Sequence, residues 1–252
     1  MGLGKGFWVG LQWPVAPGPL PQIPAMEASA LARLSELLRE VYEKLFAAFG
    51  PQGWWPGETP FEVALGAILT QNTNWHNVAR VLGELKAEGY LNASLLGELP
   101  EAELARRLRP AGYYNLKARR IRNFLAFLAG FHNSMESMTQ EKLDDLRPAL
   151  LAIKGVGPET ADSILLYALD KPTFVVDAYT FRILRRHDLI AEVCSYEELR
   201  QTFMEHLAPE LRLYQEYHAL LVRLGKEFCR PEPRCPVCPL NGWPEGWQGP
   251  PE

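Results

Sequence analysis

The sequence predicts an all-α fold. Apolar residues recur every three or four positions in several segments, which is the period of an amphipathic helix. Only one apolar run has the composition of a strand, and this run, Phe174 to Val176, is too short to found a sheet. At 252 residues the chain can bury a substantial core, as one domain or as two small ones.

The composition is that of a globular protein. Apolar residues make up 47% of the chain and charged residues 22%, and no apolar run is long enough to span a bilayer. The formal net charge of -4 argues against a strongly cationic surface that coats DNA non-specifically, although a local basic patch can still bind phosphate. The first residues lack the apolar core of a secretory signal. We therefore expect a cytoplasmic protein without membrane contact.

The N-terminal region divides into an arm and a helix. Residues 1–26 are rich in Gly and Pro without a helical or strand period, which predicts a flexible arm. Met26 is a candidate for the true start, because an amphipathic segment begins directly after it. That segment carries on one face the apolar residues Leu31, Leu34, Leu37, Leu38, Val41, Leu45 and Phe46.

Two adjacent tryptophans, Trp54 and Trp55, follow in a loop bounded by Gly53 and Pro56. Both rings cannot easily face the same core, so one of them is a candidate to line a pocket. Ordinary packing is the alternative for either ring. A helix from Phe61 to Leu69 comes next.

A polar cluster that includes Gln71 separates this helix from another apolar one, and a capping network around Asn72 and Thr73 explains part of it. Residues 111–122 then open a helix whose first turns carry four cations, among them Arg119 and Arg120. A solvated face is the default for such charges. Cations beside tyrosines and a glycine turn are also typical of a loop that contacts a nucleic acid backbone.

The remaining elements are helical with two exceptions. We expect a loop over residues 135–140 and a tail over residues 241–252. Helices are expected over residues 95–108 (as a short pair), 124–128, 196–206 and 214–228.

The stretch from Ile153 to Pro158 predicts a hairpin between two helices. Gly155 and Gly157 lack the Cβ atoms that would block positive φ or close approach, so backbone N–H groups and the next helix start can face an anion. A nucleic acid phosphate suits this role, and Lys154 adds a cation. The alternative is an ordinary turn between helices that happens to contain two glycines.

Asp177 is a single carboxylate in the apolar run that begins at Phe174. An unpaired charge is costly to bury, which indicates either a catalytic group or a helix cap.

Three of the four cysteines are crowded as Cys229-x5-Cys235-x2-Cys238. In a cytoplasmic protein this spacing indicates a metal or cluster site rather than disulfides. The fourth cysteine, Cys194, lies more than thirty residues upstream. A lone cysteine is more often a small buried hydrophobe than a ligand.

In combination, these motifs resemble the helix-hairpin-helix, Gly/Pro-Asp DNA glycosylases of the endonuclease III superfamily. The resemblance covers roughly Leu31 to Leu240, with motifs in the same order: Ile68-Leu69-Thr70-Gln71, Gly112-Tyr113-Tyr114-Asn115, the hairpin, Val176-Asp177 and the cysteine loop. It implies two helical domains with a DNA-binding cleft between them. One would be a six-helix barrel over residues 52–171, and the other would combine residues 27–51 with 172–240.

The resemblance also implies roles for single residues. Asp177 falls at the position of the catalytic aspartate, and Gln71 and Tyr113 fall where relatives fill the gap left by an extruded nucleotide. Bifunctional relatives carry a lysine nucleophile where this chain has Glu159, so strand-cleaving lyase chemistry is not expected. Glu159 at the edge of a base pocket is one interpretation, and an acid that complements the helix dipole is the favoured one.

The cysteine loop resembles the [4Fe–4S] loop of the family, except that no cysteine follows Cys238. The fourth ligand is then Cys194, a non-cysteine group, or absent. The partner implied is double-stranded DNA with a damaged base, bound by a monomer in a bacterial or archaeal cytoplasm.

The segment Trp54-Trp55-Pro56 resembles one in bacterial 3-methyladenine DNA glycosylases, which implies base excision of N-alkylated purines by a monofunctional enzyme. The alternatives are a bifunctional or mismatch-specific endonuclease III-like glycosylase, and a non-catalytic helix-hairpin-helix DNA-binding protein.

Overall fold

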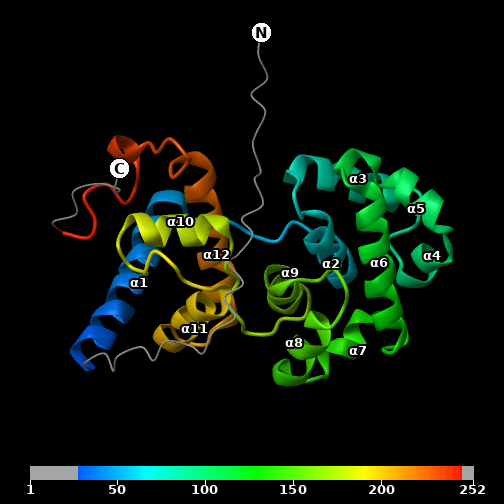
Figure 1. The fold of residues 1–252 in the computed structure, drawn as a ribbon, viewed down its shortest axis with the longest axis horizontal. Helices are drawn as coiled ribbons and strands as arrows, with labels where there is room; N and C mark the ends of the chain where they lie inside the picture. Colours follow the sequence, from blue (N-terminus) through cyan, green and yellow to red (C-terminus); the bar gives the residue numbers. More distant parts are fainter. Residues whose placement is uncertain (1–27, 246–252) are drawn as a thin grey trace, which may run out of the picture. The chain divides into compact units, whose positions relative to one another are not determined.

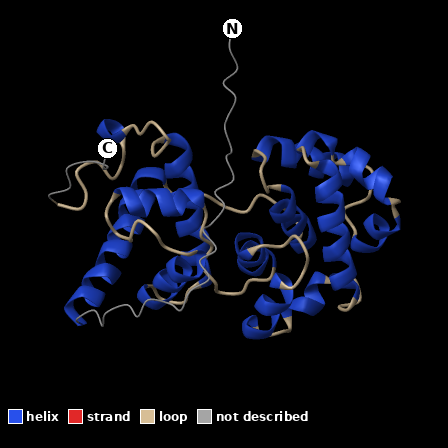
Figure 2. Cartoon of the chain, in the orientation of Figure 1, coloured by secondary structure: helices blue, strands red, loops and turns tan. Residues whose placement is uncertain are grey.

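The computed structural model describes residues 28–245, and within that range the fold is entirely helical (Figures 1 and 2). It contains the helices α1 to α12, short 3-10 turns at Arg109–Ala111 and Cys235–Val237, and no strand in the described part. The prediction of an all-α fold is confirmed. The expected arm over residues 1–26, the candidate start at Met26 and most of the expected tail lie outside the described residues. Among the described helices, none is long and apolar enough to cross a membrane.

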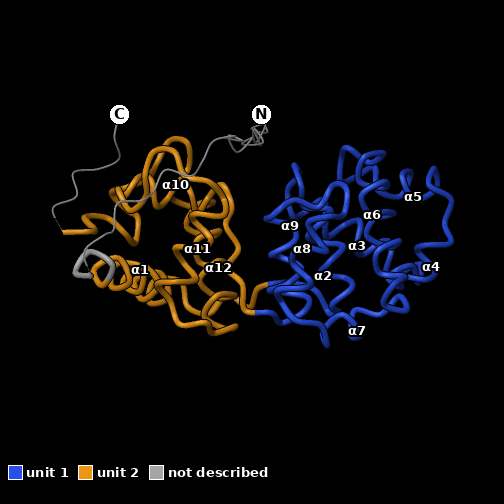
Figure 3. The backbone as a smooth tube through the Cα atoms, turned by 60° about the horizontal axis from the view of Figure 1, so that its bottom comes forward, with its two compact units in different colours: residues 1–11, 55–171 blue, residues 12–54, 172–252 orange. Residues whose placement is uncertain are grey.

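The described chain divides into two compact units (Figure 3). Trp55–Lys171 form the unit drawn in blue, here called the hairpin unit. Residues 28–54 and 172–245 belong to the other unit, drawn in orange and here called the aspartate unit. The chain therefore passes from one unit to the other between the two adjacent tryptophans.

The hairpin unit is organised around α2 (Pro60–Leu69), which is buried along nearly its whole length from Phe61 to Leu69. A helix that is apolar all round has to be enclosed by others. Around α2 lie α3, α6, α9 and the π-helical turn Ile164–Ala168 that continues α9. The other helices of this unit are α3 (Trp75–Ala87), α4 (Ala93–Glu98), α5 (Glu101–Arg107), α6 (Tyr114–Ala129), α7 (Met135–Thr139), α8 (Leu143–Leu151) and α9 (Pro158–Ser163).

The expected loop over residues 135–140 is wrong, because α7 forms there. Ser134 caps this helix by accepting a hydrogen bond from the Ser137 backbone N–H at 3.2 Å, and Met135 and Met138 are buried beneath it. One short turn with two buried methionines is too brief to show a helical period in the sequence.

The aspartate unit packs α1 (Ala28–Phe49) and α10 (Ala178–Arg186) against α12 (Leu211–Glu227), with α11 (Tyr196–His206) also against α1. Its core is aromatic. The ring of Phe174 stacks on Phe203 at 3.8 Å between centroids and meets Tyr214 and Tyr217 edge-on. The Tyr217 hydroxyl donates to the Leu38 carbonyl oxygen at 2.7 Å, which satisfies its buried polar end. This core fixes the extended run 174–177, which is a buried segment without a sheet partner among the described residues.

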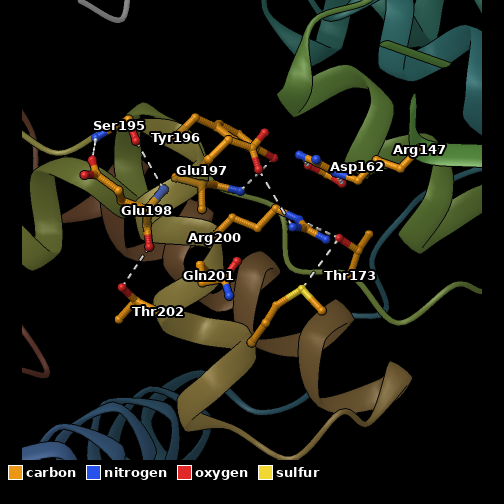
Figure 4. A network of polar contacts seen from close by, with 12 residues as sticks. Arg147, Asp162, Thr173, Ser195, Tyr196, Glu197, Glu198, Arg200, Gln201 and Thr202 are labelled. Carbon is orange, nitrogen blue, oxygen red and sulfur yellow. Dashed lines mark hydrogen bonds and ion pairs between the residues drawn. The ribbon is translucent and has the colours of Figure 1, made fainter. Parts of the chain in front are cut away.

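Two polar contacts fix the surroundings of that run (Figure 4). Arg200 donates to the Thr173 hydroxyl at 2.9 Å, so α11 holds the start of the run. Ser195 and Glu198 form a capping box at the first turn of α11. Such reciprocal hydrogen bonds satisfy two of the backbone donors that a helix start leaves open.

The packing of α10 on α12 predicts that Gly225 does not tolerate a side chain. A Cβ at this position would lie 2.4 Å from Cδ1 and 2.6 Å from Cβ of Tyr179, close to the backbone end of a ring that cannot swing away. Gly225→Ala should lower the free energy of unfolding by about 2 kcal/mol in urea titrations, because overpacking forces the two helices apart.

Gly83→Ala is the matched control. Gly83 also lies within a helix, is exposed and has nothing within 4 Å of an added Cβ, so this change should be stabilising by about 0.5–1 kcal/mol. Equal effects of the two substitutions would contradict the packing described for α10 and α12.

Candidate DNA-binding and catalytic site

The hairpin between α8 and α9 is built on two glycines that differ in their surroundings. Gly155 has φ +97° and lies against Arg120, whose Cγ would be 2.5 Å from an added Cβ. Gly157 caps α9 with extended backbone, no side-chain capping bond and no atom within 4 Å of an added Cβ. Gly155 is therefore required by the fold of the hairpin unit, whereas Gly157 leaves a bare helix start facing outward.

An ion pair ties the two hairpin helices together (Figure 4). Arg147 on α8 donates from Nε and Nη2 to the two carboxylate oxygens of Asp162 on α9, at 2.8 and 3.0 Å. Asp162 is fully buried, so loss of either partner would leave an uncompensated charge in the interior. This ion pair therefore fixes α9 relative to α8.

Gln71 lies behind the hairpin and connects it to α6. Its Nε2 donates to the Gly155 carbonyl oxygen at 3.2 Å and to the Thr160 hydroxyl at 2.7 Å, and its Oε1 accepts from Arg120. On the same helix as Arg120, Asn123 donates to the Lys154 carbonyl oxygen at 2.8 Å. Gln71 and Arg120, two of the predicted DNA-binding residues, therefore support the hairpin in this structure.

Lys154 and Arg119 present exposed cations in the same unit. Tyr113 is 67% exposed and precedes α6 with φ +46° and ψ 32°, in the left-handed region that few bulky residues adopt. An exposed aromatic residue in this sparsely populated conformation is a candidate for a functional contact. The turn before it is held by Lys117, whose Nζ donates to the Ala111 carbonyl oxygen at 2.6 Å.

The two adjacent tryptophans have different partners. Trp55 belongs to the hairpin unit, where its ring lies 5.5 Å from that of Trp75 and 5.4 Å from that of Tyr167. Trp54 belongs to the aspartate unit, where the ammonium of Lys226 lies over its ring at 5.4 Å from the centroid. Trp55 is thus part of an aromatic cluster, and Trp54 faces a cation.

Asp177 is the N-cap of α10. Its Oδ1 accepts hydrogen bonds from the Thr180 backbone N–H at 2.7 Å and from the Thr180 hydroxyl at 2.9 Å. Its Oδ2 lies 3.8 Å from Nε2 of His218 on α12. Burial opposes ionisation, but His218 and the two Thr180 hydrogen bonds outweigh it and hold the pKa of Asp177 below its usual value. The sequence left a catalytic group or a helix cap open for Asp177. In the structure it is the helix cap, and it is also buried.

Three thiols surround a hollow next to α12. Cys229, Cys235 and Cys238 line one hollow, together with Arg186, His187 and Phe228. Burial and the neighbouring thiols of Cys229 and Cys235 raise the pKa of Cys238, against the lowering effect of the Leu240 N–H, so the Cys238 sulfur lies within electrostatic range of the other two. Arg186 donates to the Cys229 sulfur at 3.4 Å, and the Leu240 N–H donates to the Cys238 sulfur at 3.5 Å.

These contacts are compatible with an iron–sulfur cluster bound by the three cysteines, because N–H groups directed at cysteine sulfurs stabilise bound thiolates. Within residues 28–245 no group of three His, Cys, Asp or Glu side chains is placed to hold a single metal ion. The sulfurs of a polynuclear cluster stand farther apart than the ligands of a single ion.

Cys194 does not line this hollow. It precedes the capping residue Ser195, and its thiol donates to the Ser195 carbonyl oxygen at 3.5 Å. Burial and Glu198 raise its pKa to about 11, which disfavours the thiolate that a metal needs. Cys194 therefore belongs to the capping turn at the start of α11 and not to the cysteine hollow.

Sequence reasoning missed the residues that adjoin the site from distant segments. Thr180 and Asn123 carried a local signal, as a cap partner and as a polar residue on α6. His218 and His187, which lines the cysteine hollow, were not identified as site residues from the sequence. Their neighbours are forty or more residues away, so no local pattern identifies them.

Comparisons with known proteins agree with this arrangement. Residues 65–209 match the family described as HhH-GPD superfamily base excision DNA repair protein. A Methanocaldococcus jannaschii protein provisionally named a DNA repair glycosylase is 46% identical over 208 residues, which cover 82% of this chain and 94% of the relative.

Two solved structures are similar as well. The 3-methyladenine DNA glycosylase of H. pylori, bound to 1,N6-ethenoadenine, is 30% identical with a TM-score of 0.65 and covers 78% of this chain and 97% of its own. A non-covalent endonuclease III–DNA complex is 25% identical with a TM-score of 0.70 and covers 82% and 92%.

The buried amine of Lys117 predicts a distinct pH dependence of stability. Burial, with a smaller contribution from Arg120, lowers its pKa from 10.5 to about 8. Between these values the unfolded chain binds more protons than the folded one, so the free energy of unfolding should rise with pH. Relative to Lys117→Met, the wild type should gain about 1–2 kcal/mol from pH 8 to 10.5 in urea titrations. A difference that stays flat over this range would show that the amine is not desolvated.

Proposed function

The chain belongs to the HhH-GPD superfamily of base excision DNA repair proteins and is a DNA glycosylase, and on that premise we propose that it is monofunctional. It hydrolyses the N-glycosidic bond of N-alkylated purines in double-stranded DNA and leaves the strand intact. The observation that carries this proposal is Glu159, exposed in the first turn of α9 at the place of the lysine nucleophile of bifunctional relatives. A carboxylate cannot form the imine on which lyase chemistry depends.

Asp177 performs the chemistry in this proposal. Its Oδ1 is occupied by the two hydrogen bonds from Thr180, so Oδ2, 3.8 Å from Nε2 of His218, is the atom proposed to stabilise positive charge on the sugar and to orient a water. The bond between C1′ and the base breaks with its electron pair on the base, and the water oxygen bonds to C1′. The proton that this water releases passes to solvent or to the departing base. An N-methylated purine leaves readily, so no strong general acid is needed.

The proposed substrate class follows from a cation and an aromatic ring. N-methylated purines are electron-poor and cationic, and a tryptophan face attracts such a ring by about 1–2 kcal/mol when water is excluded. Trp54 already faces the Lys226 ammonium, and Lys226 lies within electrostatic range of Asp177. The H. pylori relative, solved with a modified adenine, supports the same substrate class. We therefore assign base stacking to Trp54 and a packing role to Trp55.

DNA binding is proposed for the outward face of the hairpin, with Tyr113 as a wedge in the gap that an extruded nucleotide leaves. Gly157, the start of α9, Lys154 and Arg119 would contact phosphates, because bare N–H groups and cations favour an anion there. Gln71 and Arg120 would act by holding the hairpin in place.

The cysteine hollow is proposed to hold a [4Fe–4S] cluster with Cys229, Cys235 and Cys238 as ligands. Such a group would supply cross-links that stabilise the loop after α12. No step of base excision depends on it.

Gly157→Ala tests the hairpin. A methyl group has space there, so stability should be unchanged or rise by about 0.4–1 kcal/mol. The same methyl group would block close approach of a phosphate, so DNA affinity in fluorescence anisotropy should fall about tenfold on damaged and undamaged duplexes alike.

Arg119→Ala tests the cation on α6. It should reduce the salt dependence of DNA affinity by about one unit of slope. Unchanged affinity and slope in both variants would place the DNA surface elsewhere.

Substitution of the two tryptophans should separate their roles. Trp54→Ala should lower excision of methylpurines about tenfold with little loss of stability, because only the stacking face is removed. Trp55→Ala should instead lower the free energy of unfolding by about 3 kcal/mol, because it opens a cavity in an aromatic cluster. Single-turnover excision and urea titration of both variants would measure this. The reverse assignment would follow if Trp55→Ala selectively lost activity.

Asp177→Asn tests the chemistry. The amide oxygen can still cap α10, whereas the charge that stabilises the sugar cation is lost, so excision should fall by about 10²–10³-fold. DNA affinity should persist. Base release would be followed on duplexes with methylated purines, oxidised pyrimidines, uracil mismatches or abasic sites. Full activity of the variant would contradict the role of Asp177, and action on oxidised pyrimidines alone would overturn the substrate class.

A further inference from the structure

The cysteine hollow contains a fourth residue with the chemistry of a metal ligand. His187 lines the same cavity as Cys229, Cys235 and Cys238 and is only 6% exposed. It follows directly on Arg186, which donates to the Cys229 sulfur, so the end of α10 already lies against the cysteine loop. Imidazole is a common ligand of protein-bound iron, and in some iron–sulfur centres histidine replaces cysteine.

The hydrogen bond of the imidazole ring determines which nitrogen faces a ligand. Nδ1 of His187 lies 2.8 Å from the Trp243 carbonyl oxygen. A carbonyl oxygen can only accept, so Nδ1 carries the hydrogen and the lone pair of the neutral ring lies on Nε2. Metal-bound histidines are typically oriented in this way, with the other ring nitrogen donating to a carbonyl or carboxylate.

A buried tryptophan lies in the segment after Cys238, where the chain has no fourth cysteine. Trp243 is five residues after Cys238, is buried, and donates from Nε1 to Glu40 on α1 at 2.7 Å. Its ring lies 5.7 Å from that of His187. This segment is anchored and supplies the carbonyl oxygen that orients His187, so it positions a ligand although it contains none itself.

We propose that His187, through Nε2, is the fourth protein ligand of the cluster held by Cys229, Cys235 and Cys238. The inference rests on the proposed iron–sulfur cluster and adds the ligand that the cysteine count leaves open. A neutral imidazole in place of a thiolate makes the cluster less negative by one charge, which raises its reduction potential relative to an all-cysteine cluster.

The test uses the full chain, purified without oxygen after labelling of its histidines with 15N. Iron and acid-labile sulfide are measured first, and the reduced protein is then examined by pulsed EPR. The wild type should contain iron and sulfide and show the strong hyperfine coupling of a directly bound 15N. His187→Cys should keep the cluster, lose this coupling and lower the reduction potential. His187→Ala should lose iron.

His206→Gln is the matched control, because His206 lies in the same unit but binds Ser35 at 2.8 Å and does not line the hollow. This variant should keep the coupling. A wild-type cluster without nitrogen coupling, or a His187→Ala protein with unchanged iron and coupling, would overturn the assignment of His187 and leave the cluster intact. Absence of iron and sulfide from both the wild type and His187→Cys would overturn the cluster itself.

Discussion

Asp177 is buried, yet its pKa is held below the usual value, and this depends on contacts from two helices of the aspartate unit. Desolvation alone would raise the pKa of the carboxyl, so the charge persists only because Thr180 and His218 stabilise it. Thr180 is placed by the first turn of α10, and His218 by α12. Both helices are in turn fixed by close packing, of Gly225 on Tyr179 and of Phe174 on Phe203 and Tyr217. The aromatic core thus determines the electrostatics of the carboxylate above it.

The proposed role in phosphate binding places a different constraint on the hairpin unit, since a turn that binds phosphate has to expose backbone N–H groups and still keep its conformation. It does so by satisfying the inner side of the turn with side chains. Gln71 and Asn123 bond the carbonyl groups of Gly155 and Lys154, and the pair of Arg147 and Asp162 locks the two helices. The outer side at Gly157 stays bare. Pre-organisation of this kind avoids the entropy that a mobile loop would lose on binding.

The sequence predicted the helical class and most helices because periodicity and capping are local properties. The span of α11 agrees with its predicted bounds, since Ser195 and Glu198 mark its start in the sequence itself. The short helix α7 was not predicted, because a helix of about one turn shows no repeat of apolar residues in the sequence. The sequence could not predict which residues contact Asp177, Gln71 and the cysteines. Their partners are His218, Arg120 and His187, respectively, which come close only when helices distant in the sequence pack together. The sequence alone shows that the chain differs from its family at Glu159 and after Cys238. The structure is needed to show which residues surround these two positions.

The central claim is that a capped and buried carboxylate hydrolyses the glycosidic bond without an amine nucleophile. The most direct measurement is borohydride trapping of the wild-type protein on a duplex with a methylated purine, combined with analysis of the DNA strand. We expect release of the base, an intact strand with an abasic site, and no covalent protein–DNA adduct, because position 159 offers a carboxylate. A trapped adduct with strand cleavage would contradict it, and loss of that adduct in Lys226→Gln would identify the amine beside Trp54 as the nucleophile.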